Sequence, residues 1–524
     1  MRDLIHLPES DVRNTKDATT ENPPFSLRKA MCDGVIIVSL TLVAAIVRWW
    51  YFTRTAGITH TLGVEETARL KLVLGLYGPH TSFPVLSTTG PFQMIVGKLG
   101  LFFHPGAYIT RWISFYCGIL SPALCCLALK NAARPVRFCA ALAICISPAH
   151  IWFSTIGVAE ALTIFLILAA CLCYARAEKE KGFAFAWACP ALLFLSAAFM
   201  TRFETWILAP VFFADALIRF RRKFAPLWIF VFAAPIGWLI YSKMHWQGYF
   251  SSVNLHQNEM SFREALNHAR LAVQYLHEAG GWACEVLGAA GFLILVMKKK
   301  TRFIALTGIS IALLEFAMIF HKELVSDPKY SRALIVWLQI YAGAFIAAAY
   351  VFLTKKSAGF RKIPPSRACI YQYLFITLLT ITGLVSANPQ VKSQLETTLV
   401  EQGGDFQAAG QLLEYIESQM EQNANEQFAL LTSVANRNYI FLHIKAPYHR
   451  RLFMPQADFA KATEFIERSR EKNRSIPDLH GFFIVTQAYG PFSPEDDLSQ
   501  TGAMEEGTLI RIKQKSIFNI YRFL

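Results

Sequence analysis

Apolar residues occur in long runs, separated by short polar segments, over most of the chain. A helix needs roughly 20 consecutive apolar residues to cross the hydrocarbon core of a bilayer, and most of these runs are close to that length. We therefore predict a mainly α protein, a polytopic membrane helix bundle with about eleven spans. The predicted spans are 34–53, 107–129, 136–153, 156–175, 184–200, 204–218, 225–241, 281–297, 303–320, 332–354 and 368–387.

The composition agrees with this interpretation. Hydrophobic residues make up 54% of the 524 residues and charged residues 17%, whereas about 25% of an ordinary soluble domain is charged. A disordered chain, a fibrous repeat and a typical soluble enzyme are therefore excluded. The 11 cysteines lie in or beside apolar segments, and their spacing is not that of zinc ligands or of a disulfide framework.

The distribution of positive charge predicts the orientation. The net charge is +14, and Lys and Arg gather in short alternate loops, which is typical of cytoplasmic loops and not of a surface that binds nucleic acid. These loops hold 19 basic residues and two acids, and they are 130–137, 176–181, 219–223, 298–302 and 355–367. We expect the N-terminus on the same cytoplasmic side. The odd number of spans then puts the C-terminus on the outer, periplasmic or extracytoplasmic side.

The same pattern divides the chain into three parts. We predict a cytoplasmic tail over 1–33, a multi-span transmembrane domain over 34–387, and a small soluble α/β domain over 388–524 on the outer side. In the last part, amphipathic helical segments alternate with β-like runs, among them 481–488 and 508–523.

The first outer loop, 54–106, contains two adjacent acids, Glu65 and Glu66. One of them could act as a general base on an acceptor hydroxyl or amine, and the pair could help to hold a divalent cation. Alternatively, both acids mark the first turn of a helix, where the macrodipole favours negative charge. The spacing does not decide between these interpretations, nor whether a metal is required.

Three further charged residues lie at the outer ends of later spans. Glu160 is near the start of span 156–175, where an ionisable group is a candidate for function. Alternatively, it is a carboxylate at headgroup depth that snorkels or pairs with an arginine. Arg202 and Glu204 lie at the next outer turn. They could form a structural pair, or Arg202 could bind a phosphate through its planar guanidinium.

Basic and aromatic residues lie at the start of the span 332–354. Lys329, Tyr330 and Arg332 lie at its outer end. The two cations could bind a monophosphate or a diphosphate. Alternatively, basic and aromatic residues at this depth anchor a helix at the membrane interface.

The order and the sidedness of these motifs resemble the GT-C membrane glycosyltransferases, and in particular the branch of protein O-mannosyltransferases and aminoarabinose transferases (ArnT-like). The resemblance covers roughly residues 34–387. The motifs that carry it are Glu65-Glu66, Gly90-Pro91 before a short apolar helix, Arg111 at the start of a span, Ser147-Pro148 with Glu160, Thr201-Arg202-Phe203-Glu204, and Lys329-Tyr330-Ser331-Arg332.

The resemblance implies an inverting transfer of a sugar from a polyprenyl-phosphate donor to a lipid, glycan or protein acceptor at the outer face of the bilayer. It also implies that the catalytic acidic residue of the first loop, Glu65 or Glu66, serves as the base or orients the acceptor. Family members usually have Asp-Glu at this position, so the longer first side chain leaves open which acid is the base, and we favour Glu65. The substrate-binding residues that the resemblance implies are Arg111, Glu160, Arg202, Glu204, Lys329, Tyr330 and Arg332.

Two other functions compete with this one. A membrane transporter or lipid flippase would also be polytopic, but transporters often contain internal repeats and place polar groups near the midplane. We find no repeat between the two halves of the sequence, and the candidate charges lie at outer helix ends. A catalytically inactive scaffold with a receptor-like tail is a third interpretation, since Glu65-Glu66 departs from the usual pair.

Overall fold

The computed structural model describes residues 23–58, 73, 91–103, 109–179, 184–220, 225–246, 261–298, 301–320 and 328–356, together with short segments between 413 and 523. All structural statements below concern these residues. They fall into two compact units. The first contains residues 23–54 and the described residues from 73 to 356, and the second contains residues 55–58 and the segments from 413 onwards.

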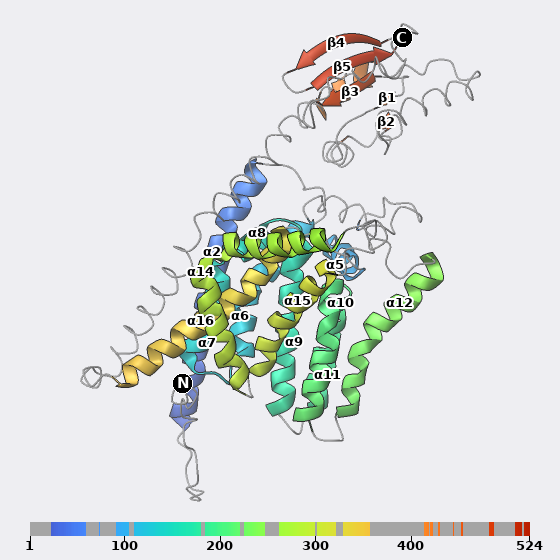
Figure 1. Ribbon diagram of the computed structural model, residues 1–524. Coiled ribbons are helices and arrows are strands. Elements are labelled where there is room, and N and C mark those ends of the chain that lie inside the picture. Colours follow the sequence, from blue (N-terminus) through green and yellow to red (C-terminus); the bar gives the residue numbers. More distant parts are fainter. Residues whose placement is uncertain are drawn as a thin grey trace, which may run out of the picture. The chain divides into compact units, whose positions relative to one another are not determined.

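The first unit is entirely helical in its described part (Figure 1). Its helices are α2 (Pro23–Ile58, up to residue 54 in this unit), α5 (Phe92–Gly100), α6 (Ile109–Ala128), α7 (Arg134–Ile146), α8 (Pro148–Thr155), α9 (Ala159–Lys179), α10 (Ala184–Phe199), η1 (Phe203–Ile207), α11 (Leu208–Arg219), η2 (Ala225–Phe232), α12 (Ala233–Trp246), α14 (Phe262–Met297), α15 (Arg302–Phe320) and α16 (Pro328–Lys356).

Six helical segments of the described chain are long and apolar enough to cross a membrane, or seven if a bent pair of helices is counted as one span. The six are Asp33–Thr53, Ile109–Ala128, Ala159–Glu178, Pro226–Met244, Gly280–Met297 and Ala333–Phe352. The protein is therefore mainly helical and a multi-pass membrane protein, as predicted.

The predicted number of about eleven spans stays a prediction. The predicted span 184–200 contains a shorter apolar helix, α10 (Ala184–Phe199), whereas the bounds of 303–320 agree with those of α15 (Arg302–Phe320). Span 204–218 divides into η1 and the 12-residue α11, and 368–387 lies outside the described residues. Apolar runs alone do not show where a helix ends inside the run.

The predicted span 136–153 is bent. Here α7 and α8 meet at an angle of 55°. Proline lacks the N–H group that a continuous helix needs, and it disfavours helical dihedral angles in the residue before it. Ser147 accordingly leaves the helix at φ −59° and ψ 114°. Its side chain then accepts a hydrogen bond from the His150 amide at 3.2 Å and caps the start of α8.

Helix α14 is also divided by a bend, at Gly281. This residue has φ 68° and ψ 157°, a conformation that a side chain disfavours. The two halves of α14 consequently run in different directions (Figure 1). The half before the bend starts with a capping box between Ser261 and Glu264, and the half after it is one of the six apolar segments.

Glycines permit the closest helix contacts in the bundle. A Cβ atom at Gly291 of α14 would lie 1.8 Å from the backbone oxygen of Tyr341 on α16, and one at Gly343 of α16 would lie 2.5 Å from the oxygen of Cys139 on α7. Because small residues let helix backbones approach in a membrane, α16 packs tightly between α14 and α7. This packing fixes the middle of α16 against both neighbouring helices.

The second unit contains strands. β1 (Phe428–Ala429) and β2 (Leu452–Phe453) pair in parallel, and β3 (Phe482–Thr486), β5 (Phe518–Phe523) and β4 (Leu509–Lys515) form an antiparallel sheet in that order. The predicted run 481–488 contains β3. The run 508–523 consists of two paired strands, since residues 516–517 separate β4 from β5. The complete α/β domain over 388–524 stays a prediction.

Candidate functional site

Glu160 lies at the start of α9, directly after the turn 156–158. It is in the first helical turn, where the macrodipole favours a carboxylate, and it is only 5% exposed. The Ser114 hydroxyl on α6 donates a hydrogen bond to the backbone oxygen of Val158 at 3.1 Å. Helix α6 therefore holds the turn that sets the position of Glu160.

Arg202 connects Glu160 to Glu204. It follows the end of α10 with an extended backbone, at φ −144° and ψ 125°. Its Nη1 lies 2.5 Å from Glu160 Oε1, while Nη2 and Nε donate to the two oxygens of Glu204 at 2.7 and 3.2 Å. The paired contact with Glu204 has the two-pronged geometry that guanidinium and carboxylate groups prefer. One arginine thus joins α9 to the turn after α10.

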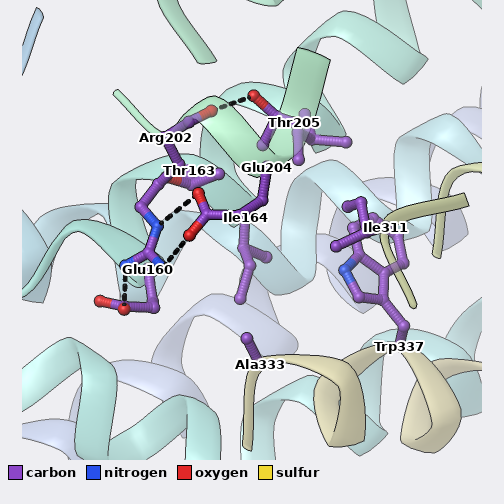
Figure 2. A pocket seen from close by; sticks show the side chains of 10 residues that line it. Glu160, Thr163, Ile164, Arg202, Glu204, Thr205, Ile311, Ala333 and Trp337 are labelled. Carbon is purple, nitrogen blue, oxygen red and sulfur yellow. Dashed lines mark hydrogen bonds and ion pairs between the residues drawn. The ribbon is translucent and has the colours of Figure 1, made fainter. Parts of the chain in front are cut away.

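A cavity of about 40 Å³ adjoins these three side chains (Figure 2). Such a volume holds a few water molecules or one polar group of a ligand. Besides Glu160, Arg202 and Glu204, the residues that line it are Thr163, Ile164, Ile167, Thr205, Ile311, Ala333 and Trp337. The walls therefore come from α9, η1, α15 and α16.

The cluster at this cavity combines two carboxylates with one guanidinium. The second oxygen of Glu160, Oε2, is buried and has no hydrogen-bond partner among the described residues. An unpaired buried acceptor costs about 1–3 kcal/mol, and more when it is charged. The arrangement therefore suits a ligand that donates a hydrogen bond, such as a hydroxyl or an amine.

The structure brings the side chains of Glu160, Arg202 and Glu204 together. Of the other predicted site residues, it describes some only by their position in a helix and some not at all. Arg111 is buried in the first turn of α6, the helix that carries Ser114. Lys329, Tyr330 and Arg332 are in the first turns of α16, directly before the cavity residue Ala333, and their side chains lie outside what the structure describes. Glu65 and Glu66 lie outside the described residues as well.

Several cavity residues were not predicted from the sequence. Thr163 follows Glu160 by three residues and so lies on the same face of α9, which is a signal that could have identified it. Ile311 and Trp337 are apolar residues in apolar helices. Nothing in the sequence separates them from their neighbours, because only the tertiary packing brings them to the cavity.

No group of three or more metal-ligating side chains occurs in the described part of the chain. The acidic pair that could help to hold a divalent cation lies outside that part. In the cavity, both oxygens of Glu204 and one oxygen of Glu160 already contact Arg202.

Known structures of low sequence identity have the same fold. The crystal structure of ArnT from Cupriavidus metallidurans bound to undecaprenyl phosphate matches 93% of this chain and 97% of its own, at 13% identity and a TM-score of 0.56. The apo structure of the same ArnT matches 94% of this chain and 98% of its own, at 14% identity and a TM-score of 0.55. No family model and no curated protein matches the sequence.

The oligosaccharyltransferase of Archaeoglobus fulgidus, tethered to an acceptor peptide, is similar over a smaller part of its length. It matches 86% of this chain and 69% of its own, at 10% identity and a TM-score of 0.51. These similarities confirm the GT-C fold that the sequence motifs indicated. Because the identities are low, they concern the fold.

Proposed function

We propose that the protein is an integral-membrane glycosyltransferase that moves a sugar from a polyprenyl-phosphate donor to an acceptor. The fold supports this, since one similar structure has undecaprenyl phosphate bound and another an acceptor peptide. A fold by itself does not determine an activity. The observation that carries the proposal is a buried oxygen of Glu160 that has no hydrogen-bond partner among the described residues, at a cavity in that fold.

In the proposed reaction, an acceptor hydroxyl or amine attacks the anomeric carbon of the sugar. The bond between that carbon and the phosphate oxygen breaks, and a bond to the acceptor atom forms with inversion. The proton of the acceptor passes to a carboxylate, for which Glu65 is the first candidate and Glu66 the second. The polyprenyl phosphate leaves with the electron pair of the broken bond. A carboxylate near the acceptor suits this proton transfer.

Within this scheme, Glu160 accepts a hydrogen bond from the sugar or from the acceptor. Arg202 and Glu204 hold its carboxylate in place, because the guanidinium contacts both acids. The guanidinium of Arg202 is already engaged by two carboxylates. We therefore assign the lipid phosphate to Lys329, Tyr330 and Arg332 at the start of α16, with Arg111 as a further cation, and we assign to Arg202 mainly the orientation of Glu160.

Binding of the lipid phosphate tests this assignment. We expect Arg332→Lys to weaken the binding of undecaprenyl phosphate by about tenfold, because lysine keeps the charge but loses the planar fork that grips two phosphate oxygens. Purified protein in nanodiscs, titrated with a fluorescent undecaprenyl phosphate, provides the measurement. The matched control is Arg134→Lys. Arg134 forms an ion pair with Asp33 where α7 contacts α2, and this variant should bind undecaprenyl phosphate with wild-type affinity.

Two results would contradict the assignment. One is a wild-type protein that does not bind the lipid phosphate at all. The other is equal affinity in wild type, Arg332→Lys and Arg332→Gln, which would remove Arg332 from the phosphate site.

The outer, periplasmic location of the site is part of the proposal. It rests on the 19 basic residues in the predicted cytoplasmic loops. The ion pair between Arg219 and Glu178, at 3.1 Å, joins two of those loops, at the opposite end of α9 from Glu160. Protease added outside sealed cells should cleave within 388–524 and leave the loop 219–223 intact. Protection of 388–524 together with cleavage in 219–223 would contradict the predicted orientation and indicate the opposite one.

A further inference from the structure

Arg48 is a charged residue inside a membrane span. It lies in the segment Asp33–Thr53 of α2, and its side chain is fully buried. A charge at such a position is costly and persists where it has a role. None of the ion pairs among the described residues includes Arg48, and the partners that its guanidinium does have there are hydrogen-bond acceptors.

Five hydrogen bonds surround the guanidinium, and a guanidinium has five N–H donors. Four of the five acceptors belong to the end of α7 and to α8, and one belongs to α2 itself. The contacts are Nε to Ser154 Oγ at 3.3 Å, Nη1 to the oxygens of Ala44 and Cys145 at 3.3 Å each, and Nη2 to the oxygen of Ile144 at 3.1 Å and to His150 Nδ1 at 2.6 Å. We call this set the Arg48 network. With all its donors used, Arg48 has none left for a ligand.

The network replaces hydrogen bonds that the bend between α7 and α8 removes. The last carbonyl groups of a helix have no partner within the helix, and inside a membrane such groups must find one. Arg48 donates to the carbonyl oxygens of Ile144 and Cys145, in the last turn of α7. A positive charge at a helix C-terminus is also favoured by the macrodipole. Arg48 therefore stabilises the bend.

Helix α6 is in close contact with the Arg48 network at Gly118. A Cβ atom at Gly118 would lie 2.2 Å from Ser154 Oγ and 2.9 Å from Arg48 Nε, so only glycine fits at this contact. One helical turn earlier, Ser114 holds the oxygen of Val158. Helix α8 is consequently contacted by both α2 and α6 at Ser154, and α6 also holds the turn after it.

We propose that Arg48 is a positioning residue for Glu160. The Arg48 network sets the direction of α8, and α8 leads through the turn 156–158 into the first turn of α9, where Glu160 faces the cavity. The proposal rests on the proposed function, because Glu160 is its substrate-binding residue. Misplacement of a functional group by about 1 Å can lower a rate by about 10²-fold, so a small rotation of α8 has a measurable effect on transfer.

The test uses Arg48→Gln and Arg48→Lys in the full-length protein in nanodiscs. Hydrogen–deuterium exchange reports on the backbone of 148–160 without requiring activity. In both variants we expect faster exchange over 148–160 and a kcat for sugar transfer that falls by about 10- to 100-fold, while the KM for the lipid-linked donor changes by less than about threefold. Lysine keeps the charge but has three donors in place of five, so the smaller change belongs to Arg48→Lys.

Two matched variants separate positioning from general stability. Arg134→Gln weakens the Asp33 contact near the starts of α2 and α7, and it should leave both the exchange over 148–160 and the kcat at wild-type values. Ser154→Ala removes one acceptor of the network and keeps Arg48. It should show the same changes as Arg48→Gln with smaller amplitude, and it serves as the test if the Arg48 variants do not fold.

The outcomes are distinguishable. Unchanged exchange over 148–160 in Arg48→Gln and Ser154→Ala overturns the role of the network in holding α8. Faster exchange with an unchanged kcat overturns the positioning role. A wild-type protein that transfers no sugar overturns the proposed function, and the role of Arg48 in transfer with it, whatever the exchange shows.

Discussion

An Arg202→Met variant should lose about 3–5 kcal/mol of unfolding free energy, because removal of one partner leaves a buried charge without compensation. Here it leaves two, since the side chains of Glu160 and Glu204 are 5% and 12% exposed and both contact Arg202. The measurement is chemical or thermal unfolding of the purified variant in detergent. Arg134→Met is the matched control. Its side chain is 34% exposed, and we expect a loss of less than about 1 kcal/mol.

The double variant Arg202→Met/Glu160→Gln makes this prediction more specific. It removes one of the two uncompensated carboxylates, so it should recover part of the loss, as expected for side chains in one network. Equal stability of Arg202→Met and wild type would mean that the ion pairs with Glu160 and Glu204 do not contribute to the folded state.

A Glu65→Gln variant should lower the turnover of sugar transfer by about 10²- to 10⁴-fold, the usual contribution of general base catalysis. Glutamine keeps the size of the side chain and its hydrogen bonding but does not accept the proton. Binding of undecaprenyl phosphate should be retained, since we assign the phosphate to residues at the start of α16. Steady-state kinetics with a labelled donor, together with the binding titration, measure the two effects separately.

Glu66→Gln is the matched control for this variant. We expect a smaller loss of turnover, arising from weaker binding of the acceptor or of a metal. Near-normal turnover in Glu65→Gln together with no turnover in Glu66→Gln would show that Glu66, and not Glu65, is the base. If neither substitution lowers turnover, the two acids are a feature of a helix start, and the transferase assignment loses its catalytic base.

The sequence predicted the membrane-spanning character of the chain and three members of the candidate site. Apolar runs identify spans because the bilayer sets their length. The proximity of Arg202 and Glu204 was foreseeable, because they are two residues apart. The contact of Arg202 with Glu160 joins residues that are 42 positions apart. It depends on how α9 and α10 pack, which no local pattern contains.

The role of Arg48 could not be predicted for a similar reason. It precedes Trp49, Trp50 and Tyr51 at the end of the first apolar run, and these aromatic residues are typical of the membrane interface. Whether a long basic side chain at that depth extends towards the headgroups or turns into the bundle depends on acceptors in another helix. Those acceptors exist because Pro148 interrupts the span, and the consequence of that interruption is visible only in three dimensions.

The most direct test of the proposed function follows the lipid phosphate. Purified protein in nanodiscs is supplied with undecaprenyl-phosphate and dolichyl-phosphate sugars that carry a label on the sugar, with a membrane fraction of the source cells as acceptor. We predict that free polyprenyl phosphate appears in step with labelled acceptor, and that Glu160→Gln slows both by at least about tenfold. If the protein, reconstituted in vesicles, moves the intact donor across the bilayer and neither free lipid phosphate nor labelled acceptor appears, the result contradicts transfer and identifies a flippase.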